Sequence, residues 1–184
     1  MLDRKEIESI DTDYKGYKFR SRLEARWAVF FEELDLLWKY EPERIKLTNG
    51  DPYLPDFYLP EKEFWLEIKP VKKSVSNWPD HPALQNFPSK HTNNAANRQF
   101  YLIKGRPYIG QGHGTEEAKY EIFVEGDSNY YFCECPKCGE IGIEFMGRAE
   151  RLGCSCNIEE THNLRTDKLL EAYEAASKIR FEDL

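Results

Sequence analysis

The chain has 184 residues, of which 40% are hydrophobic, so it has room for one domain with a small appendage and enough apolar surface to argue against wholesale disorder. It contains neither a run of about 18 apolar residues nor a signal-peptide pattern, which argues against a membrane partner and predicts a cytoplasmic protein. The formal net charge of −7 is a mild argument against nucleic acid as partner, but residues 15–26 carry five basic side chains and one acidic.

The first predicted element is a helix over residues 21–37. Its apolar positions recur at alternating steps of four and three residues, as one face of a helix requires: Leu23, Trp27, Phe30, Leu34 and Leu37. Ser21 has the side chain of a helix cap. We expect Trp27, Phe30 and Phe31 to lie in the core.

Three strands are predicted next, over residues 38–47, 53–59 and 64–69. The sequence Asn-Gly-Asp-Pro at 49–52 supplies turn chemistry between the first two, and Pro-Glu-Lys at 60–62 turns the chain into the third. Connections this short predict an antiparallel meander.

The rest of the chain predicts shorter elements and a final helix. They are a long loop entering a helix of uncertain extent (71–98), a strand (100–104), a glycine-rich loop (105–114) and a hairpin that leads into the cysteines (119–124 and 129–133). The final helix spans residues 164–180 and aligns four residues on one face: Leu169, Ala172, Tyr173 and Ala176.

The residues that carry chemistry lie on the first helix and on the second and third strands. Glu67 and Lys69 project to one face because alternate side chains of a strand share a face, and the preceding strand carries Asp56 across a tight turn. Glu24 of the helix can pack over the same sheet. Grouped carboxylates repel one another, and a divalent cation bound through oxygen, with one lysine, compensates them. The set suits phosphodiester hydrolysis, with Lys69 positioning a water or stabilising charge on the phosphate.

Pro55-Asp56 followed by Glu67-Ile68-Lys69 resembles the signature of the PD-(D/E)XK nuclease superfamily, in which a helix glutamate such as Glu24 is also common. The C-terminal helix sequence is similar to a phage-encoded and bacterial branch with a cysteine module. The resemblance implies a restriction-endonuclease-like α/β fold, with a mixed sheet flanked by helices, and a metal-dependent DNA endonuclease. It implies Asp56, Glu67 and the Ile68 carbonyl as ligands of a catalytic Mg²⁺ or Mn²⁺ ion, with Glu24 in support.

Four basic residues are the predicted DNA-binding set: Lys18, Arg20, Arg22 and Arg26. A DNA backbone must pass close to the metal, and Arg22 and Arg26 stand four residues apart on the helix, where they can hold adjacent phosphates. Such residues also suit a solvated helix face, and an isolated Glu-x-Lys suits an exposed strand face. The sequence alone therefore leaves a structural interpretation of both groups open.

All five cysteines lie within residues 133–156, and clustering of this kind in a chain without an export signal predicts a metal site rather than disulfides. The predicted ligands of a structural zinc ion are Cys135, Cys138, Cys154 and Cys156, with Cys133 in reserve and His162 as a substitute. Four thiolates complete a tetrahedral site and leave no position open for water, so the zinc is predicted to be structural.

The sequence predicts three parts: a nuclease core (1–125), a zinc ribbon-like module (126–160) and a C-terminal helix that packs on the core (161–184). The predicted partner is DNA, with a homodimer or a larger protein complex allowed, and the location is the host cytoplasm if the chain is phage-encoded. Two alternatives stay open, namely a catalytically silent nucleic-acid-binding protein and a zinc-dependent protein-interaction module on a nuclease fold. The histidines outside the cysteine segment lack ligand spacing and receive no role: His81, His91 and His113.

Overall fold

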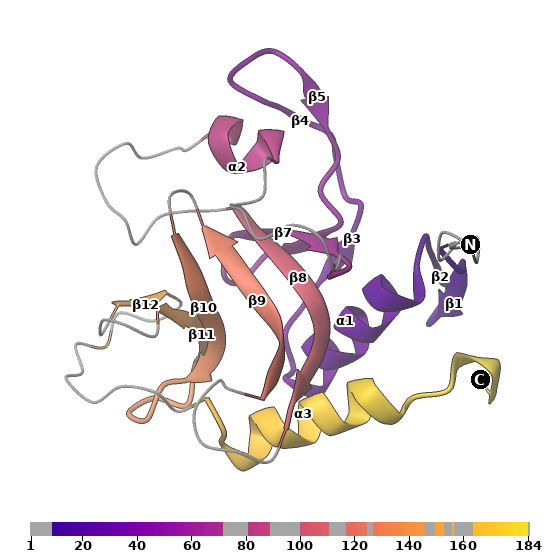
Figure 1. Cartoon of the computed structure of the whole chain (residues 1–184), viewed down its shortest axis with the longest axis vertical. Coiled ribbons are helices and arrows are strands. Elements are labelled where there is room, and N and C mark those ends of the chain that lie inside the picture. Colours follow the sequence, from indigo (N-terminus) through magenta and orange to yellow (C-terminus); the bar gives the residue numbers. More distant parts are fainter. Residues whose placement is uncertain are drawn as a thin grey trace, which may run out of the picture.

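The computed structural model describes residues 9–71, 81–88, 100–110, 117–124, 127–145, 150–152, 156 and 164–183. The architecture is mixed α/β, with helices packed against a large mixed sheet (Figure 1), which confirms the predicted fold class at that level. Within the described ranges, no helix is long and apolar enough to cross a membrane.

The main sheet has eight strands in the order β12-β11-β10-β9-β8-β7-β6-β3. β7 and β8 run parallel, and the other neighbouring pairs run antiparallel. The strands are β3 (Lys39–Tyr40), β6 (Phe57–Leu59), β7 (Phe64–Lys69), β8 (Phe100–Ile109), β9 (Ala118–Val124), β10 (Asp127–Glu134), β11 (Ile141–Phe145) and β12 (Glu150–Leu152). Two smaller sheets pair β1 (Thr12–Tyr14) with β2 (Tyr17–Phe19) and β4 (Ile45–Lys46) with β5 (Pro52–Tyr53).

The predicted antiparallel meander is confirmed as β3, β6 and β7, and β7 has the predicted bounds. The other two predicted strands are interrupted. The strand over 38–47 breaks after β3, where Glu41 has a φ of 43° and a proline follows. The strand over 53–59 breaks at Pro55, which has no N–H group to donate to a neighbouring strand.

β8 is longer than predicted, because the strand continues through Gly105 to Ile109. The prediction of a glycine-rich loop from residue 105 is therefore wrong for 105–109, while 111–114 lie outside the described residues. A Cβ atom at Gly105 would come within 2.0 Å of the Lys119 carbonyl oxygen, and the φ of 104° also requires glycine. The indole Nε1 of Trp27 donates a hydrogen bond to the Gly105 carbonyl at 3.0 Å. The absence of a side chain at Gly105 thus allows β8 and β9 to approach each other closely.

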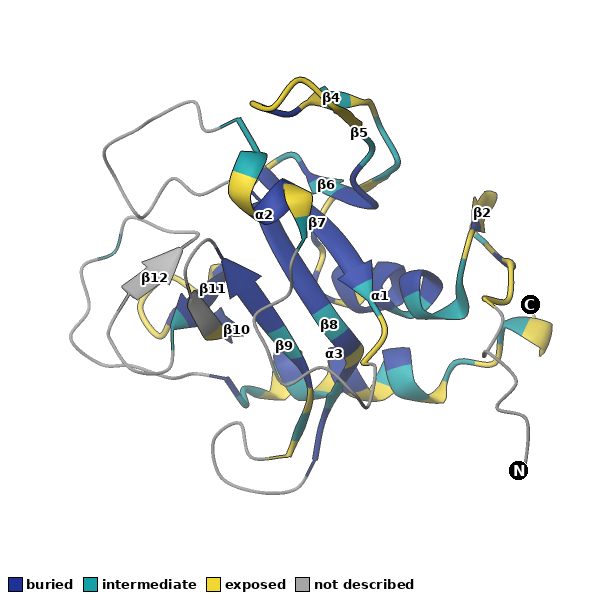
Figure 2. Ribbon diagram, turned by 45° about the horizontal axis from the view of Figure 1, so that its top comes forward, coloured by how far each residue is buried: buried dark blue, intermediate teal, exposed yellow. Residues whose placement is uncertain are grey.

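Helices α1 (Arg22–Glu33) and α3 (Asp167–Lys178) lie on one face of the sheet, and α2 (Pro82–Asn86) lies on the other (Figure 2). A short 3-10 turn, η2 (Phe181–Asp183), follows α3. α1 starts after Ser21 as predicted but ends early, because Asp35 adopts a φ of 57°. Leu37, the last predicted position of the apolar face, is 62% exposed. Apart from α2, the predicted helix reaching Arg98 lies outside the described residues.

Two hydrophobic clusters lie on the two faces of the sheet. The larger one joins α1 and α3 to the sheet, and it contains the residues that the sequence placed in the core: Trp27, Phe30, Phe31, Leu169, Ala172, Tyr173 and Ala176. The smaller one lies under α2 and consists of Leu47, Trp65, Ala83, Leu84, Phe100, Leu102 and Phe123. By strand alternation, Glu67, Lys69 and Lys104 lie on the face of the smaller cluster.

The predicted hairpin before the cysteines is confirmed as β9 and β10. β10 then pairs with β11, and β11 with β12, within the same sheet as the core strands. The strands of the predicted zinc module therefore extend the main sheet rather than forming a sheet of their own.

Candidate active site and cysteine cluster

Asp56 and Glu67 are brought together by the pairing of β6 with β7. Asp56 immediately precedes β6, and the register pairs Phe57 with Leu66. Oδ2 of Asp56 accepts a hydrogen bond from the backbone N–H of Ile68 at 2.7 Å. On β7, the ammonium group of Lys69 donates to Oε1 of Glu67 on the shared strand face. The predicted acidic pair and lysine thus form one group.

Glu24 is fixed at the start of α1 by a reciprocal cap. Oγ of Ser21 accepts from the Glu24 backbone N–H at 3.1 Å and donates to Oε1 of the Glu24 side chain at 2.7 Å. The hydroxyl of Tyr40 on β3 donates to Oε2 of Glu24 at 2.6 Å. Both oxygens of this carboxylate are therefore held, and one partner, Tyr40, was not found by sequence reasoning.

The three carboxylates are buried and carry more negative charge than their surroundings compensate. Their exposed fractions are 8% for Glu24, 1% for Asp56 and 4% for Glu67. Burial, then the charges of Glu67 and Glu24, raise the pKa of Asp56 to about 8 against the lowering effect of the Ile68 N–H and of Lys69. Oε2 of Glu67 is buried without a hydrogen-bond partner among the described residues. A bound cation would relieve both features.

The carboxylates do not form a closed cage of three ligands. Among the described residues, the one group of three or more metal-binding side chains whose ligand atoms all lie within 4.8 Å of one another consists of cysteines. Glu24, Asp56 and Glu67 are spaced more widely than this.

Arg20 is the predicted DNA-binding residue that contacts the site. Its Nη2 donates to Oδ1 of Asp56 at 2.8 Å and lies 2.6 Å from Oε1 of Glu41, although more than half of the Arg20 side chain is exposed. The guanidinium therefore balances part of the carboxylate charge. Lys18 lies apart on β2, where its Nζ is 3.7 Å from Oδ2 of Asp11 and both side chains are exposed.

Arg22 and Arg26 are occupied by the C-terminal segment. Arg22 pairs with Glu182 of η2. Arg26 donates to carbonyl oxygens at the end of α3, at 2.9 Å to Ser177 and 3.4 Å to Ile179. A cation suits the last carbonyls of a helix, so Arg26 fastens α3 to α1, a role that helix spacing did not indicate.

Two aromatic residues that the sequence did not single out as functional lie beside Glu67. The pKa of Tyr53 is raised, chiefly by burial and then by the charge of Glu67 close to its hydroxyl. The ring of His81 lies 5.6 Å from that of Tyr53. Tyr53 stands shortly before Asp56 in the sequence but His81 follows the motif at a distance, and the packing of β5 and α2 onto the sheet brings both beside Glu67.

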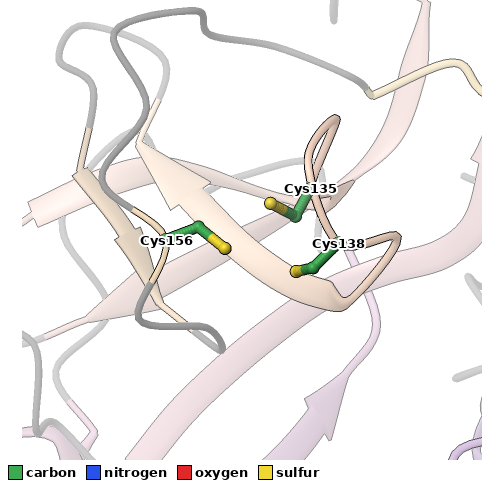
Figure 3. A group of neighbouring side chains, drawn as sticks. All are labelled: Cys135, Cys138 and Cys156. Carbon is green, nitrogen blue, oxygen red and sulfur yellow. The ribbon is translucent and has the colours of Figure 1, made fainter.

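The sulfur atoms of Cys135, Cys138 and Cys156 all lie within 4.8 Å of one another (Figure 3). Cys135 and Cys138 lie in the turn after β10, where the Gly139 N–H donates to the Cys135 carbonyl at 2.8 Å and Gly139 has a φ of 73°. Hydrogen bonding to Cys138, then burial and Cys135, raise the pKa of the Cys156 thiol. These three residues can bind a metal ion such as zinc, as predicted.

The other two cysteines, Cys133 and Cys154, are not among these three. Cys133 is buried in the larger hydrophobic cluster on β10 and lies outside the metal-binding group, which supports its reserve status. Cys154, the fourth predicted ligand, lies outside the described residues, and so does His162.

Three comparisons with known proteins return no match: no family model fits the chain, and no curated protein or solved structure is significantly similar. The function is therefore inferred from the residues of the site.

Proposed function

We propose that this protein is a magnesium-dependent DNA endonuclease of the PD-(D/E)XK type, built on a restriction-endonuclease-like core. The observation that carries the proposal is the grouping of Asp56, Glu67 and Lys69 through the pairing of β6 with β7. The sequence order of these residues matches the motif, and their spatial grouping is what phosphodiester hydrolysis requires.

The donor set fits a hard divalent cation. Asp56 and Glu67 offer carboxylate oxygens, the Ile68 carbonyl is the third protein ligand that the motif implies, and Oε2 of Glu67 is buried without a hydrogen-bond partner in the described part of the chain. When bound, Mg²⁺ polarises the phosphodiester and lowers the pKa of a coordinated water. Mn²⁺ prefers the same oxygen donors and serves as a substitute.

The chain's own residues supply the remaining steps. The ammonium of Lys69 positions the attacking water or stabilises charge that develops on the phosphoryl oxygens. Glu24, held by Ser21 and Tyr40, adds negative charge near Asp56 and strengthens the demand for a cation. Arg20 pairs with Asp56, and because more than half of its side chain is exposed, its guanidinium would also be accessible to a DNA phosphate that binds at this edge of the site.

The cysteine cluster has a separate, structural role in this proposal. Cys135, Cys138 and Cys156, with Cys154 as the fourth ligand, hold one zinc ion beside β10 and β11. A zinc ion held there would connect the turn after β10 to Cys156, which follows β12, and would so stabilise one end of the sheet.

The test is incubation of the protein with linear, supercoiled, branched and single-stranded DNA in Mg²⁺ or in EDTA. We expect cleavage of at least one substrate in Mg²⁺ and none in EDTA. Glu67→Gln should abolish cleavage, whereas Glu61→Gln, at an exposed glutamate in the turn before β7, should leave it unchanged. DNA binding without cleavage would support a catalytically silent protein instead, and absence of both would support a protein-interaction module.

A further inference from the structure

A second lysine lies beside Lys69 on the neighbouring strand. The parallel register of β7 and β8 pairs Lys69 with Lys104 and Glu67 with Leu102. Because alternate residues share a face, Phe100, Leu102 and Lys104 point to the same side of the sheet as Glu67 and Lys69. Like charges side by side on adjacent strands are destabilising, so the pair of lysines calls for an explanation.

The charge of Lys104 is not neutralised within the described part of the chain. Lys69 pairs with Glu67, but no described carboxylate forms an ion pair with Lys104. The register places Glu121 of β9 opposite Lys104, yet the ammonium lies over the Phe123 ring instead, 5.0 Å from its centroid. Lys104 is half-buried, which limits its hydration. An anion bound beside Lys104 would gain a cation that no described carboxylate pairs with.

His81 borders the same place. Its ring stacks on Phe100 at a centroid distance of 6.1 Å, and Phe100 lies on the Lys104 face of β8. Nδ1 of His81 is buried without a hydrogen-bond partner among the described residues. Burial lowers the pKa of His81, and the charges of Lys69 and Lys104 lower it further against the effect of Glu67. The imidazole is thus a neutral polar group on the face of the sheet that carries Lys69 and Lys104.

We propose that Lys104 and His81, together with Lys69, form a phosphate subsite that binds a second backbone phosphate of the nucleic-acid substrate, next to the one that is cleaved. That the ligand of this subsite is DNA follows from the proposed nuclease function. The subsite is independent of the basic residues near α1, because Arg20 contacts Asp56 and Glu41, and Arg26 holds the end of α3. The subsite places one flank of the DNA strand on the face of β8 that carries Lys104, and α2 lies on the same face of the sheet (Figure 2).

Each member of the subsite contributes differently. Lys104 supplies a charge, so its removal reduces the number of counterions released when DNA binds. His81 supplies a hydrogen bond and no charge. Its loss should therefore weaken binding without altering the salt dependence. Lys69 belongs to the proposed catalytic group and is left intact in the test.

The test measures binding of a short fluorescein-labelled DNA duplex by anisotropy in EDTA, from about 50 to about 200 mM salt. For Lys104→Gln we expect weaker binding and a slope of log K against log salt reduced by about 0.9, the value for one phosphate contact. Lys104→Arg should keep the slope. His81→Phe, which keeps the ring stack, should weaken binding at an unchanged slope. Lys168→Gln is the matched control, because Lys168 lies on α3 across the sheet and pairs with Asp35 at 3.5 Å.

Cleavage kinetics in Mg²⁺ separate this inference from the proposed function. Lys104→Gln should raise KM with kcat within about twofold of wild type. Wild-type affinity and slope in Lys104→Gln would overturn the subsite and leave the nuclease proposal standing. The expected slopes without any cleavage would overturn the nuclease and leave the subsite. A wild-type protein that does not bind the duplex would overturn the subsite as well. Circular dichroism melting of each variant establishes that it is folded.

Discussion

The backbone N–H of Ile68 donates to Oδ2 of Asp56 at 2.7 Å, so a side chain from the segment before β6 is hydrogen-bonded to the middle of the Glu67-Ile68-Lys69 motif. The hydrogen bond holds the Asp56 side chain against β7, the strand that carries Glu67 and Lys69. A carboxylate held in this way by the backbone has little freedom to move away from Glu67. Substitutions that keep its shape should therefore report on charge rather than on position.

Replacing Asp56 by asparagine should change how stability depends on pH. Asp56 has a folded-state pKa of about 8 against an ordinary value of 3.8, so the native protein holds one more proton than the unfolded chain between about pH 4 and pH 8. The free energy of unfolding of cation-free wild type should fall as pH rises through that window. Asp56→Asn should show a flatter profile, measured by urea unfolding in EDTA. Equal dependence of the unfolding free energy on pH in the two proteins would mean that Asp56 is not the carboxyl with the raised pKa.

Magnesium should restore the stability that the protein loses at higher pH, and it should do so only in the wild type. A cation that binds the native state alone stabilises it by mass action, so Mg²⁺ should raise the melting temperature of wild type above pH 7. Asp56→Asn should respond little. A similar rise in both proteins would place the cation elsewhere.

Lys69→Arg should separate binding from cleavage. Arginine keeps the positive charge, but its planar guanidinium cannot reproduce a compact ammonium that positions water. We expect DNA affinity near that of wild type and a fall in kcat of about 10²-fold. Anisotropy and single-turnover cleavage measure the two quantities. Wild-type turnover would assign Lys69 a structural role as the partner of Glu67.

Ser21→Ala should affect both stability and catalysis, because Ser21 caps α1 and also holds Glu24. The lost cap should lower the free energy of unfolding by about 1 kcal/mol. Thr166→Ala is the matched control, since Thr166 caps α3 by accepting from the Leu169 N–H. Both variants should lose comparable stability, but only Ser21→Ala should slow cleavage. Equal cleavage rates in the two variants would show that the orientation of Glu24 does not matter.

The purified protein should contain about one zinc ion per chain, measured by elemental analysis after reducing purification. Cys138→Ser should lose the ion and melt at a lower temperature, because a closed thiolate site contributes directly to folding. Cys133→Ser should keep zinc, since Cys133 lies in the hydrophobic cluster. Glu67→Ala should also keep it. Loss of zinc from Glu67→Ala would mean that one composite metal site had been mistaken for two.

The parts of the fold that sequence reasoning predicted depend on short-range patterns. The alternation around Glu67 and Lys69 fixed the bounds of β7, the apolar period gave the buried faces of α1 and α3, and Ser21 marked the start of α1. Asp56 was paired with Glu67 because a tight turn leaves few alternatives. The spacing of the cysteines likewise indicated three residues that the fold brings together.

The parts that it missed depend on long-range contacts. Gly105 was taken as a loop residue because the approach of Lys119 from β9 has no signal in the local sequence. The contact of Arg26 with the carbonyl oxygens at the end of α3 was missed because these partners lie about 150 residues further along the chain. His81 and Lys104 meet near Lys69 only through the parallel pairing of β7 with β8 and the packing of α2. No spacing rule connects them.

The most direct test of the central claim is the rate at which supercoiled plasmid is cut by wild type and by Asp56→Asn, purified in parallel and assayed in Mg²⁺ and in EDTA. The grouping of Asp56, Glu67 and Lys69 around a cation predicts cutting by wild type in Mg²⁺, none in EDTA, and a rate at least about 10²-fold lower for Asp56→Asn. Equal rates for the two proteins, or wild-type cutting that persists in EDTA, would contradict it.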